Sequence, residues 1–141
     1  MIYFTVYYYY GGIAMRMSDY NPDLGFIRFS TPDLTETMLF YTELGFDVLG
    51  TDMEDDHQTI YLKLGHLVLA VDERTNAATE NGGTMHYSIQ VDDIQGAYDL
   101  ICSRGLNSLN EEIRSGILMG KDARFFSVQG PAGEIILFLQ F

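Results

Sequence analysis

The feature that most constrains the fold is an internal repeat with an offset of 60 residues. Asp33 and Asp93 each precede a helical pattern, and Gly45 and Gly105 each follow one. A strand-like segment precedes each helix with the same offset. A whole strand–helix–glycine unit that recurs in register indicates an internal duplication. With 141 residues in all, the chain is expected to form two small halves that share one core.

The helical signal in each half is an aspartate, an apolar pattern at helical spacing and a glycine. In the first half, Pro32 suits the first turn and Leu34, Met38 and Tyr41 share one face. The second half repeats this pattern over residues 94–104. Aspartate caps the start of a helix and glycine ends it, so two helices of about three turns each are expected.

Strand-like segments surround the two helices. In the first half they cover residues 26–31, 46–52, 59–64 and 67–71. In the second half they cover residues 86–91, 106–114, 124–129 and 134–141, and the segment 106–114 is the weakest. The polar, turn-rich segment 73–83 indicates a linker. The predicted order of elements in each half is therefore βαβββ, and the predicted fold class of the chain is α+β.

These patterns divide the chain into an extension and one domain of two modules. The predicted parts are an N-terminal extension (1–23), module one (24–72), a linker (73–83) and module two (84–141). The first 14 residues contain four consecutive tyrosines and no Lys or Arg before their apolar part, so they are a poor signal peptide. Either they form an extra edge strand or dimer arm, or they lie outside a domain that begins at Met15 or Met17.

Composition restricts the partners. Eight Lys and Arg against 20 Asp and Glu give a net charge of −12, which disfavours nucleic acid and anionic membranes. No stretch is long and apolar enough for a spanning helix. Cys102 is the only cysteine, so no intrachain disulfide forms and a cytoplasmic location is expected.

Several short motifs resemble those of the vicinal oxygen chelate superfamily, which includes glyoxalase I, bleomycin-resistance proteins and extradiol dioxygenases. They are Ile27–Phe29 with Asp33-Leu34, Phe40–Phe46 (FYTELGF), His86–Asp92 (HYSIQVD) and Gly130–Glu134 (GPAGE). The resemblance covers about residues 24–141. It implies two tandem βαβββ modules that form a U-shaped mixed sheet around a central cavity, with the helices outside, in a homodimer.

Strand alternation then selects the residues expected to face the cavity. They are Phe26, Arg28, Ser30, His86, Ser88, Gln90, Leu137 and Leu139. Their neighbours in the strands, such as Phe29 and Ile136, are expected to pack under the helices. A ligand-binding site at these eight residues is the prediction.

The metal-ligand positions that the resemblance implies are mostly occupied by residues that cannot bind a metal. They fall on Phe26, near Leu69, on His86 and on Leu137. Only His86 carries a donor, and a divalent ion needs several imidazole or carboxylate ligands. The sequence therefore predicts no metal and no other cofactor, and makes metal-dependent chemistry doubtful.

Two polar residues of the predicted cavity have alternative roles. His86 is either a relic of an ancestral metal ligand or a ligand-binding or acid–base residue. Arg28 binds either a ligand's carboxylate or phosphate, or an internal acid such as Glu134, because a buried guanidinium is rarely unpaired. Three aromatic residues form either walls of the cavity or ordinary core: Tyr61, Phe125 and Phe126.

Three functions are compatible with these patterns. The first is a metal-free protein that sequesters or senses a small organic ligand, as bleomycin-resistance proteins do. The alternative is an enzyme of the same fold, a lyase, isomerase or dioxygenase, with non-standard metal ligands or with His86 as acid–base. The third is a scaffold or interaction protein whose cavity is filled by its own side chains. The first is preferred, since fold alone does not fix function.

Overall fold

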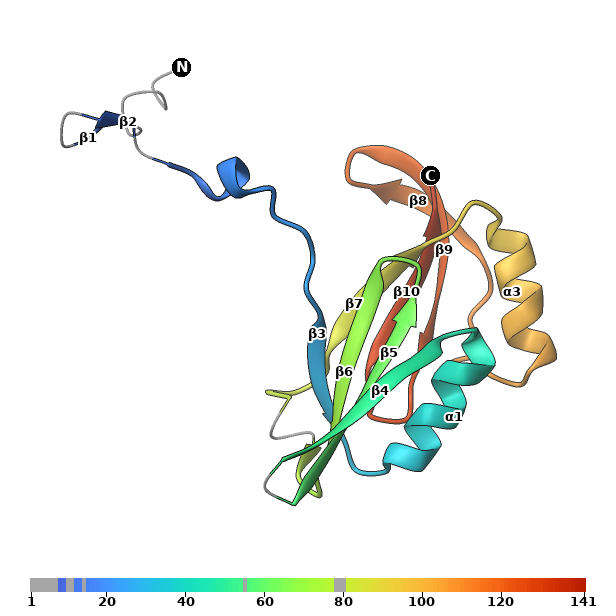
Figure 1. Cartoon of the computed structure of the whole chain (residues 1–141). Coiled ribbons are helices and arrows are strands. Elements are labelled where there is room, and N and C mark those ends of the chain that lie inside the picture. Colours follow the sequence, from blue (N-terminus) through green and yellow to red (C-terminus); the bar gives the residue numbers. More distant parts are fainter. Residues whose placement is uncertain (1–7, 10–11, 14, 55, 78–80) are drawn as a thin grey trace.

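The computed structural model describes residues 8–9, 12–13, 15–54, 56–77 and 81–141 (Figure 1). Near the N-terminus, β1 (Tyr8–Tyr9) pairs with β2 (Gly12–Ile13), and a 3-10 helix η2 follows (Met17–Tyr20). Residues 15–24 extend away from the modules in Figure 1. Much of the tyrosine-rich segment lies outside the described residues, so its predicted role stays open.

The predicted duplication is confirmed. Module one consists of β3 (Ile27–Thr31), α1 (Leu34–Leu44), β4 (Asp47–Glu54), β5 (His57–Leu64) and β6 (Leu67–Glu73). Module two consists of β7 (His86–Gln90), α3 (Ile94–Ser103), β8 (Arg114–Leu118), β9 (Lys121–Gln129) and β10 (Ile135–Gln140). Each module is a βαβββ unit.

Each module builds one four-stranded mixed sheet. The strand orders are β3-β6-β5-β4 and β7-β10-β9-β8, with the first and last strands of each module parallel and the other pairs antiparallel. The helices lie on one side of the sheets (Figure 1), as predicted. The sheets remain separate, since β3 and β7 are each bonded to a single neighbour.

The helix ends form as their capping residues require. The Asp33 carboxylate accepts from the Glu36 N–H at 3.0 Å, and Asp93 accepts from the Gly96 N–H at the same distance. Gly45 ends α1 with φ of 109°, a left-handed conformation in which only glycine is free of strain. The local signals of the sequence are therefore sufficient to place both helices.

Each helix start is also tied to the last strand of its own module. The Leu34 N–H donates to Glu73 Oε2 and the Ile94 N–H to Gln140 Oε1, both at 2.9 Å. Glu73 and Gln140 are thus equivalent positions, 67 residues apart. This defines the correspondence between the last strands of the modules.

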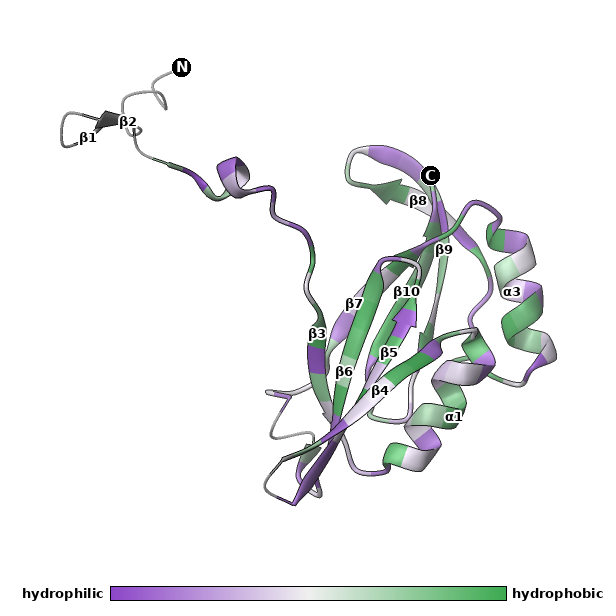
Figure 2. Ribbon diagram, in the orientation of Figure 1, coloured by the Kyte–Doolittle hydropathy of each residue, from purple (hydrophilic) through white to green (hydrophobic). Residues whose placement is uncertain are grey.

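One hydrophobic core joins the two modules. The buried cluster includes Phe29, Leu62 and Leu69 of module one and Phe126 and Ile136 of module two. In Figure 2, β6 is largely hydrophobic, and both helices alternate hydrophobic and hydrophilic residues. Phe126 stacks on Phe138 with ring centroids 5.3 Å apart, so Phe126 is a core residue and not a cavity wall.

A buried polar network crosses the seam between the modules. The Tyr87 hydroxyl donates to the Tyr41 hydroxyl at 2.6 Å, and Tyr41 donates to Glu134 Oε2 at 2.7 Å. The Ala132 N–H donates to Glu134 Oε1 at 2.9 Å. Burial raises the pKa of Glu134 and of both tyrosines, because it disfavours their charged forms.

One predicted strand is wrong. The segment 106–114 was expected to be a strand, but the strand β8 begins at Arg114 and the preceding residues form turns. Asn110 has a φ of 52°, and the Ser108 hydroxyl exchanges hydrogen bonds with the backbone of Gln129. A tight turn at Met119-Gly120, with φ of 53° and 73°, then joins β8 to β9. The turn lacks the usual Asn-Gly or Asp-Gly sequence.

No helix among the described residues has the length and apolar character that spanning a membrane requires.

Candidate functional site

The side of each sheet that faces away from the helices carries the predicted binding residues. Phe29, Ile136 and Phe138 are buried in the core beneath the helices. Alternation along β3, β7 and β10 turns their neighbours in the strands to the opposite side. We call this side the concave face, with one half on each module.

In module one, the concave face is built around an ion pair. Arg28 Nη1 contacts both carboxylate oxygens of Asp72, at 2.9 and 3.0 Å, and the Thr59 hydroxyl donates to the same carboxylate. Parallel pairing of β3 with β6 brings Arg28 near Asp72, and antiparallel pairing of β5 with β6 places Thr59 opposite Asp72. The hydrogen bond that Arg28 donates to Asp72 raises the pKa of Arg28, so the guanidinium stays charged.

The internal acid that holds Arg28 is therefore Asp72 and not Glu134. Two aromatic rings complete the group. The Arg28 guanidinium lies 5.5 Å from the centroid of Phe26, and the Tyr61 ring meets Phe26 edge-on at 6.0 Å. Tyr61 in turn donates to Asp52 at 2.9 Å. Tyr61 thus belongs to an aromatic wall on the concave face.

A cavity of about 500 Å³ lies beside this ion pair. It is lined by Arg28, Phe29, Ser30, Asp72, Arg74, Asn81 and Met85. The Asn81 carboxamide accepts from the Ser30 N–H at 2.7 Å and donates to the Ser30 carbonyl at 2.9 Å, so it occupies the free edge of β3. Arg74 Nη1 lies 2.8 Å from His57 Nε2. Two arginines and one carboxylate leave this cavity cationic.

Module two presents a more apolar hollow of about 350 Å³. It is lined by His86, Tyr87, Ser88, Ser127, Ile135 and Leu137. His86 and Ser88 are exposed, and neither side chain makes a hydrogen bond within the part of the chain that the structure describes. Their donors and acceptors are free to meet a ligand.

The structure brings together only some of the eight predicted residues. Arg28 and Ser30 line the first cavity, His86, Ser88 and Leu137 the second, and Gln90 a third of about 620 Å³ with Val91, Asp92, Gln140 and Phe141. Phe26 and Leu139 border none of these three. The first two cavities are neighbours along the chain, because Met85 lines one and His86 the other. The predicted shared cavity is thus divided between the modules.

Sequence reasoning missed four residues of this surface: Asp72, Thr59, Arg74 and Asn81. Arg74 and Asn81 lie in the segment that was treated only as a linker. Asp72 carried a usable signal, since it is an acid at a position that alternates with the core residues Leu69 and Val71. Asn81 carried no such signal, because its contact spans 51 residues.

The residues at the family's metal positions do not fit a metal. Leu69 is fully buried and faces the helix side, so the position on β6 that matches Leu137 is Ala70, the partner of Arg28 in the register. Neither Ala70 nor Leu137 can donate to an ion, and His86 alone provides one donor. Among the described residues, no three His, Cys, Asp or Glu side chains gather as a metal site would require.

Comparison with known proteins agrees with this fold. The glyoxalase family protein from Enterococcus faecalis is 20% identical over 85% of this chain and 98% of its own, with a TM-score of 0.67. A bleomycin resistance determinant encoded on transposon Tn5 is 20% identical over 84% of this chain and 98% of its own, with a TM-score of 0.64. A bleomycin-binding protein solved with bleomycin is 18% identical over 85% and 99%, with a TM-score of 0.61.

No curated protein sequence matches the chain. A family model, by contrast, matches residues 23–138, which is most of the chain and includes both βαβββ modules up to Phe138 in β10. The chain belongs to the Glyoxalase/Bleomycin resistance protein/Dioxygenase superfamily.

Proposed function

We propose that the protein is a metal-free, cytoplasmic, small-molecule-binding protein that sequesters or senses an organic ligand on its concave face. The binding residues of this proposal are Phe26, Arg28, Ser30, His86, Ser88, Gln90, Leu137 and Leu139. The observation that supports it most is the pair of neighbouring hollows, of about 500 and 350 Å³, on the two modules. Hollows of this size suit organic ligands.

The two hollows differ in chemistry, which favours an organic ligand with two kinds of group. The hollow of module one offers the guanidinium of Arg28, while that of module two offers Ile135 and Leu137 beside the imidazole of His86. A ligand that spans both would place a polar or anionic group near Arg28 and an apolar body over Leu137. The bleomycin-binding protein of the same fold makes bleomycin the first compound to test.

A homodimer is part of this proposal. The outer edges of β3 and β7 carry no further strand among the described residues, although Asn81 covers β3 at Ser30, and Phe26 on the concave face is 49% exposed. Free sheet edges and exposed aromatic rings favour association with a second chain. Sedimentation should give about twice the monomer mass of 16.0 kDa. A monomer at micromolar concentration contradicts the dimer, and a variant without residues 1–14 tests the arm separately.

The function is tested by ligand identification followed by substitution. Mass spectrometry should detect an organic compound that co-purifies with the protein, and thermal shift should rank it with bleomycin. Arg28→Met and His86→Phe should each weaken binding about 10- to 150-fold, the effect of losing a charge-assisted hydrogen bond. The variant Lys63→Gln removes one exposed charge of β5 outside both hollows and should bind as the parent does.

The stability of Arg28→Met must be measured with its affinity. Because the Asp72 carboxylate is 7% exposed, loss of its partner should lower the free energy of unfolding by about 1 kcal/mol, a small value since the Arg28 side chain is 46% exposed. Unchanged affinity in both Arg28→Met and His86→Phe would contradict the proposed site. A stoichiometric metal retained after dialysis would contradict the metal-free function.

A further inference from the structure

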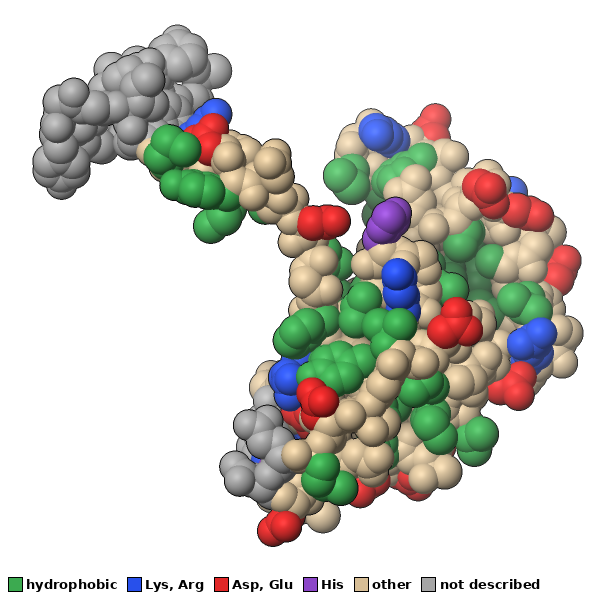
Figure 3. Space-filling model, in the orientation of Figure 1, with side chains coloured by type: hydrophobic (Ala, Val, Ile, Leu, Met, Phe, Trp, Pro, Cys, Tyr) green, Lys and Arg blue, Asp and Glu red, His purple; other side chains and the backbone are tan. Residues whose placement is uncertain are grey.

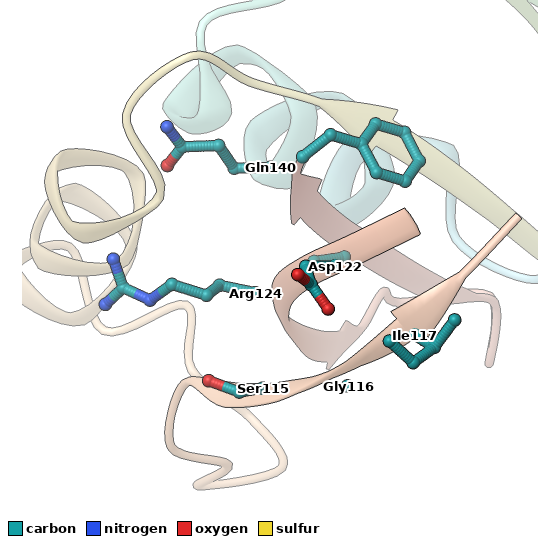
Figure 4. Close-up of a pocket in the computed structure, with 8 residues that line it drawn as sticks. Ser115, Gly116, Ile117, Asp122, Arg124 and Gln140 are labelled. Carbon is teal, nitrogen blue, oxygen red and sulfur yellow. The ribbon is translucent and has the colours of Figure 1, made fainter. Parts of the chain in front are cut away.

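Module two contains a further cavity, distinct from the hollows that Arg28 and His86 line. Its volume is about 530 Å³, and eight residues line it: Ser115, Gly116, Ile117, Asp122, Ala123, Arg124, Gln140 and Phe141. They come from the hairpin β8–β9 and from the end of β10 (Figure 4). We call it the hairpin cavity.

The strand register forms a row of three polar side chains in this cavity. Gln140 pairs with Arg124 across β10 and β9, and Arg124 pairs with Ser115 across β9 and β8. Directly opposite residues point to the same face of a sheet, with Cβ atoms about 5 Å apart. Figure 4 accordingly shows Gln140 and Arg124 extending to the same side from neighbouring strands.

This row is open because α3 does not cover it. The helix packs on the neighbouring residues of the same face, where Tyr98 meets Phe126 at 5.1 Å. Its first residue, Ile94, is bonded to Gln140, so the helix begins beside the row and runs away from it. The Gln140 carboxamide is thereby fixed, with its amino group donating to the Asp92 carbonyl at 2.8 Å.

The hairpin is a basic region in an acidic protein. Residues 114–124 contain three basic residues and one acid, whereas the whole chain carries a net charge of −12. Figure 3 shows acidic side chains spread over the visible face of both modules. Arg114 forms an ion pair with Glu111 at 3.2 Å, and Lys121 forms none with a described residue. Arg124 has no hydrogen bond or ion pair within the described residues.

Apolar side chains border the same cavity. Ile117 is 66% exposed and Phe141 is 39% exposed, and the Lys121 ammonium group lies 5.2 Å from the Phe141 ring centroid. Asp122, the partner of Ile117 in the register, adds one negative charge at the next row. This carboxylate would repel a second anionic group on a ligand, so the site is suited to a single negative charge.

We propose that the hairpin cavity is a second ligand site, specific for organic monocarboxylates with an apolar body. The Arg124 guanidinium would bind the carboxylate in bidentate geometry, with the Ser115 hydroxyl as a further donor. The apolar body would rest against Ile117, which shares the Ser115 side of β8. Arg124 and Ser115 face the opposite side of the module-two sheet from His86, and Arg28 belongs to the other sheet, so the proposal does not depend on the function proposed for the concave face.

The test uses the full chain labelled with ¹⁵N and two matched probes, 3-phenylpropionate and its neutral amide. The carboxylate should shift the backbone amide resonances of Ser115, Ile117 and Arg124 in a saturable manner, and the amide should bind at least about 10-fold more weakly. Arg124→Gln should weaken the carboxylate by the same order. Lys63→Gln removes the positive charge of an exposed side chain on β5 and should leave the affinity for the carboxylate unchanged.

Three outcomes would overturn this site. They are the absence of saturable shifts at the hairpin amides, equal affinity for the acid and its amide, and equal affinity in Arg124→Gln and the parent. Shifts confined to residues 28 and 86 would move carboxylate binding to the concave face and reject the hairpin cavity. Retained peak dispersion in Arg124→Gln shows that any loss is not unfolding.

Discussion

The two modules share a backbone plan but place opposite chemistry at equivalent positions of the seam. Tyr41, Tyr87 and Glu134 form a buried hydrogen-bonded network. The duplication aligns these three residues with Ile101, Ile27 and Leu67, which belong to the apolar core or pack against it. One seam therefore contains a polar network and, at the symmetry-related positions, its apolar counterpart.

The concave face also differs between the modules: its polar group is in module one, and the equivalent positions of module two are mostly apolar. Module one carries Arg28, Asp72 and Thr59 in one hydrogen-bonded group, and the equivalent residues of module two are Ser88, Leu139 and Phe125. A duplicated backbone thus tolerates both chemistries, provided that each buried polar group finds a partner. The difference shows that each module has its own hydrogen-bond partners for its polar side chains, independent of the backbone plan that the modules share.

The largest loss of stability is expected at Gly130, where the backbone packs directly against the side chain of Glu134. A Cβ atom at Gly130 would lie 2.3 Å from the carboxyl carbon of Glu134, which is 1% exposed and bound to Tyr41 and Ala132. Since that side chain is not free to move, Gly130→Ala should lower the free energy of unfolding by about 2–3 kcal/mol. Urea denaturation measures this loss.

The matched control is Gly25→Ala, because a Cβ there meets nothing within 4 Å. It should stay within about 0.5 kcal/mol of the parent. Equal stability of Gly130→Ala and the parent would show that the seam does not hold Glu134 rigidly.

A smaller effect is expected when the network loses its middle member. Tyr41→Phe keeps the ring but removes the hydroxyl that both donates to Glu134 and accepts from Tyr87. Two buried polar groups then lose a partner, so the free energy of unfolding should fall by about 2 kcal/mol. Tyr98→Phe in α3 keeps its contact with Phe126 and should change it by less than about 0.5 kcal/mol. Similar losses in both variants would contradict a special role of the seam.

The subtlest effect is a pH dependence. Burial raises the pKa of Glu134 above its ordinary value of 4.5, so the folded state holds this proton more tightly than the unfolded chain. The stabilisation that this tighter proton binding provides is complete below pH 4.5, and it is lost as the pH rises through the raised pKa of Glu134. Glu134→Gln does not titrate, and its unfolding free energy relative to the parent should therefore rise across that window. A constant difference between pH 4 and 8 would contradict the raised pKa.

The sequence predicted the fold because its signals are local or periodic. Asp33, Asp93, Gly45 and Gly105 specify the helix ends through contacts with their own neighbours, and alternation separates core from surface along each strand. The 60-residue offset then predicts the duplication without any knowledge of contacts. The one strand that failed, 106–114, lies where side-chain hydrogen bonds from Ser108 replace a ladder and where the turn at Met119-Gly120 lacks a common turn sequence.

The candidate site could be predicted only in part. Alternation placed Arg28 and His86 on the concave face, but it could not show that their hollows are separate or that Arg28 binds Asp72 across 44 residues. Position 69 was assigned to the metal set in place of Ala70, because a shift of one residue reverses the face of a strand. Local sequence patterns determine which face of the sheet a side chain lies on, and the register between strands determines which residues it contacts.

The sequence by itself determined two duplicated βαβββ units, their helix ends and the lack of metal donors at Phe26 and Leu137. Tertiary structure alone decided that Glu134 binds Tyr41 from 93 residues away and that Arg124 stands open between Gln140 and Ser115. The physical reason is that a buried or paired polar group is defined by its partner. Partners on different strands are chosen by sheet register and helix placement, which depend on the packing of the whole core.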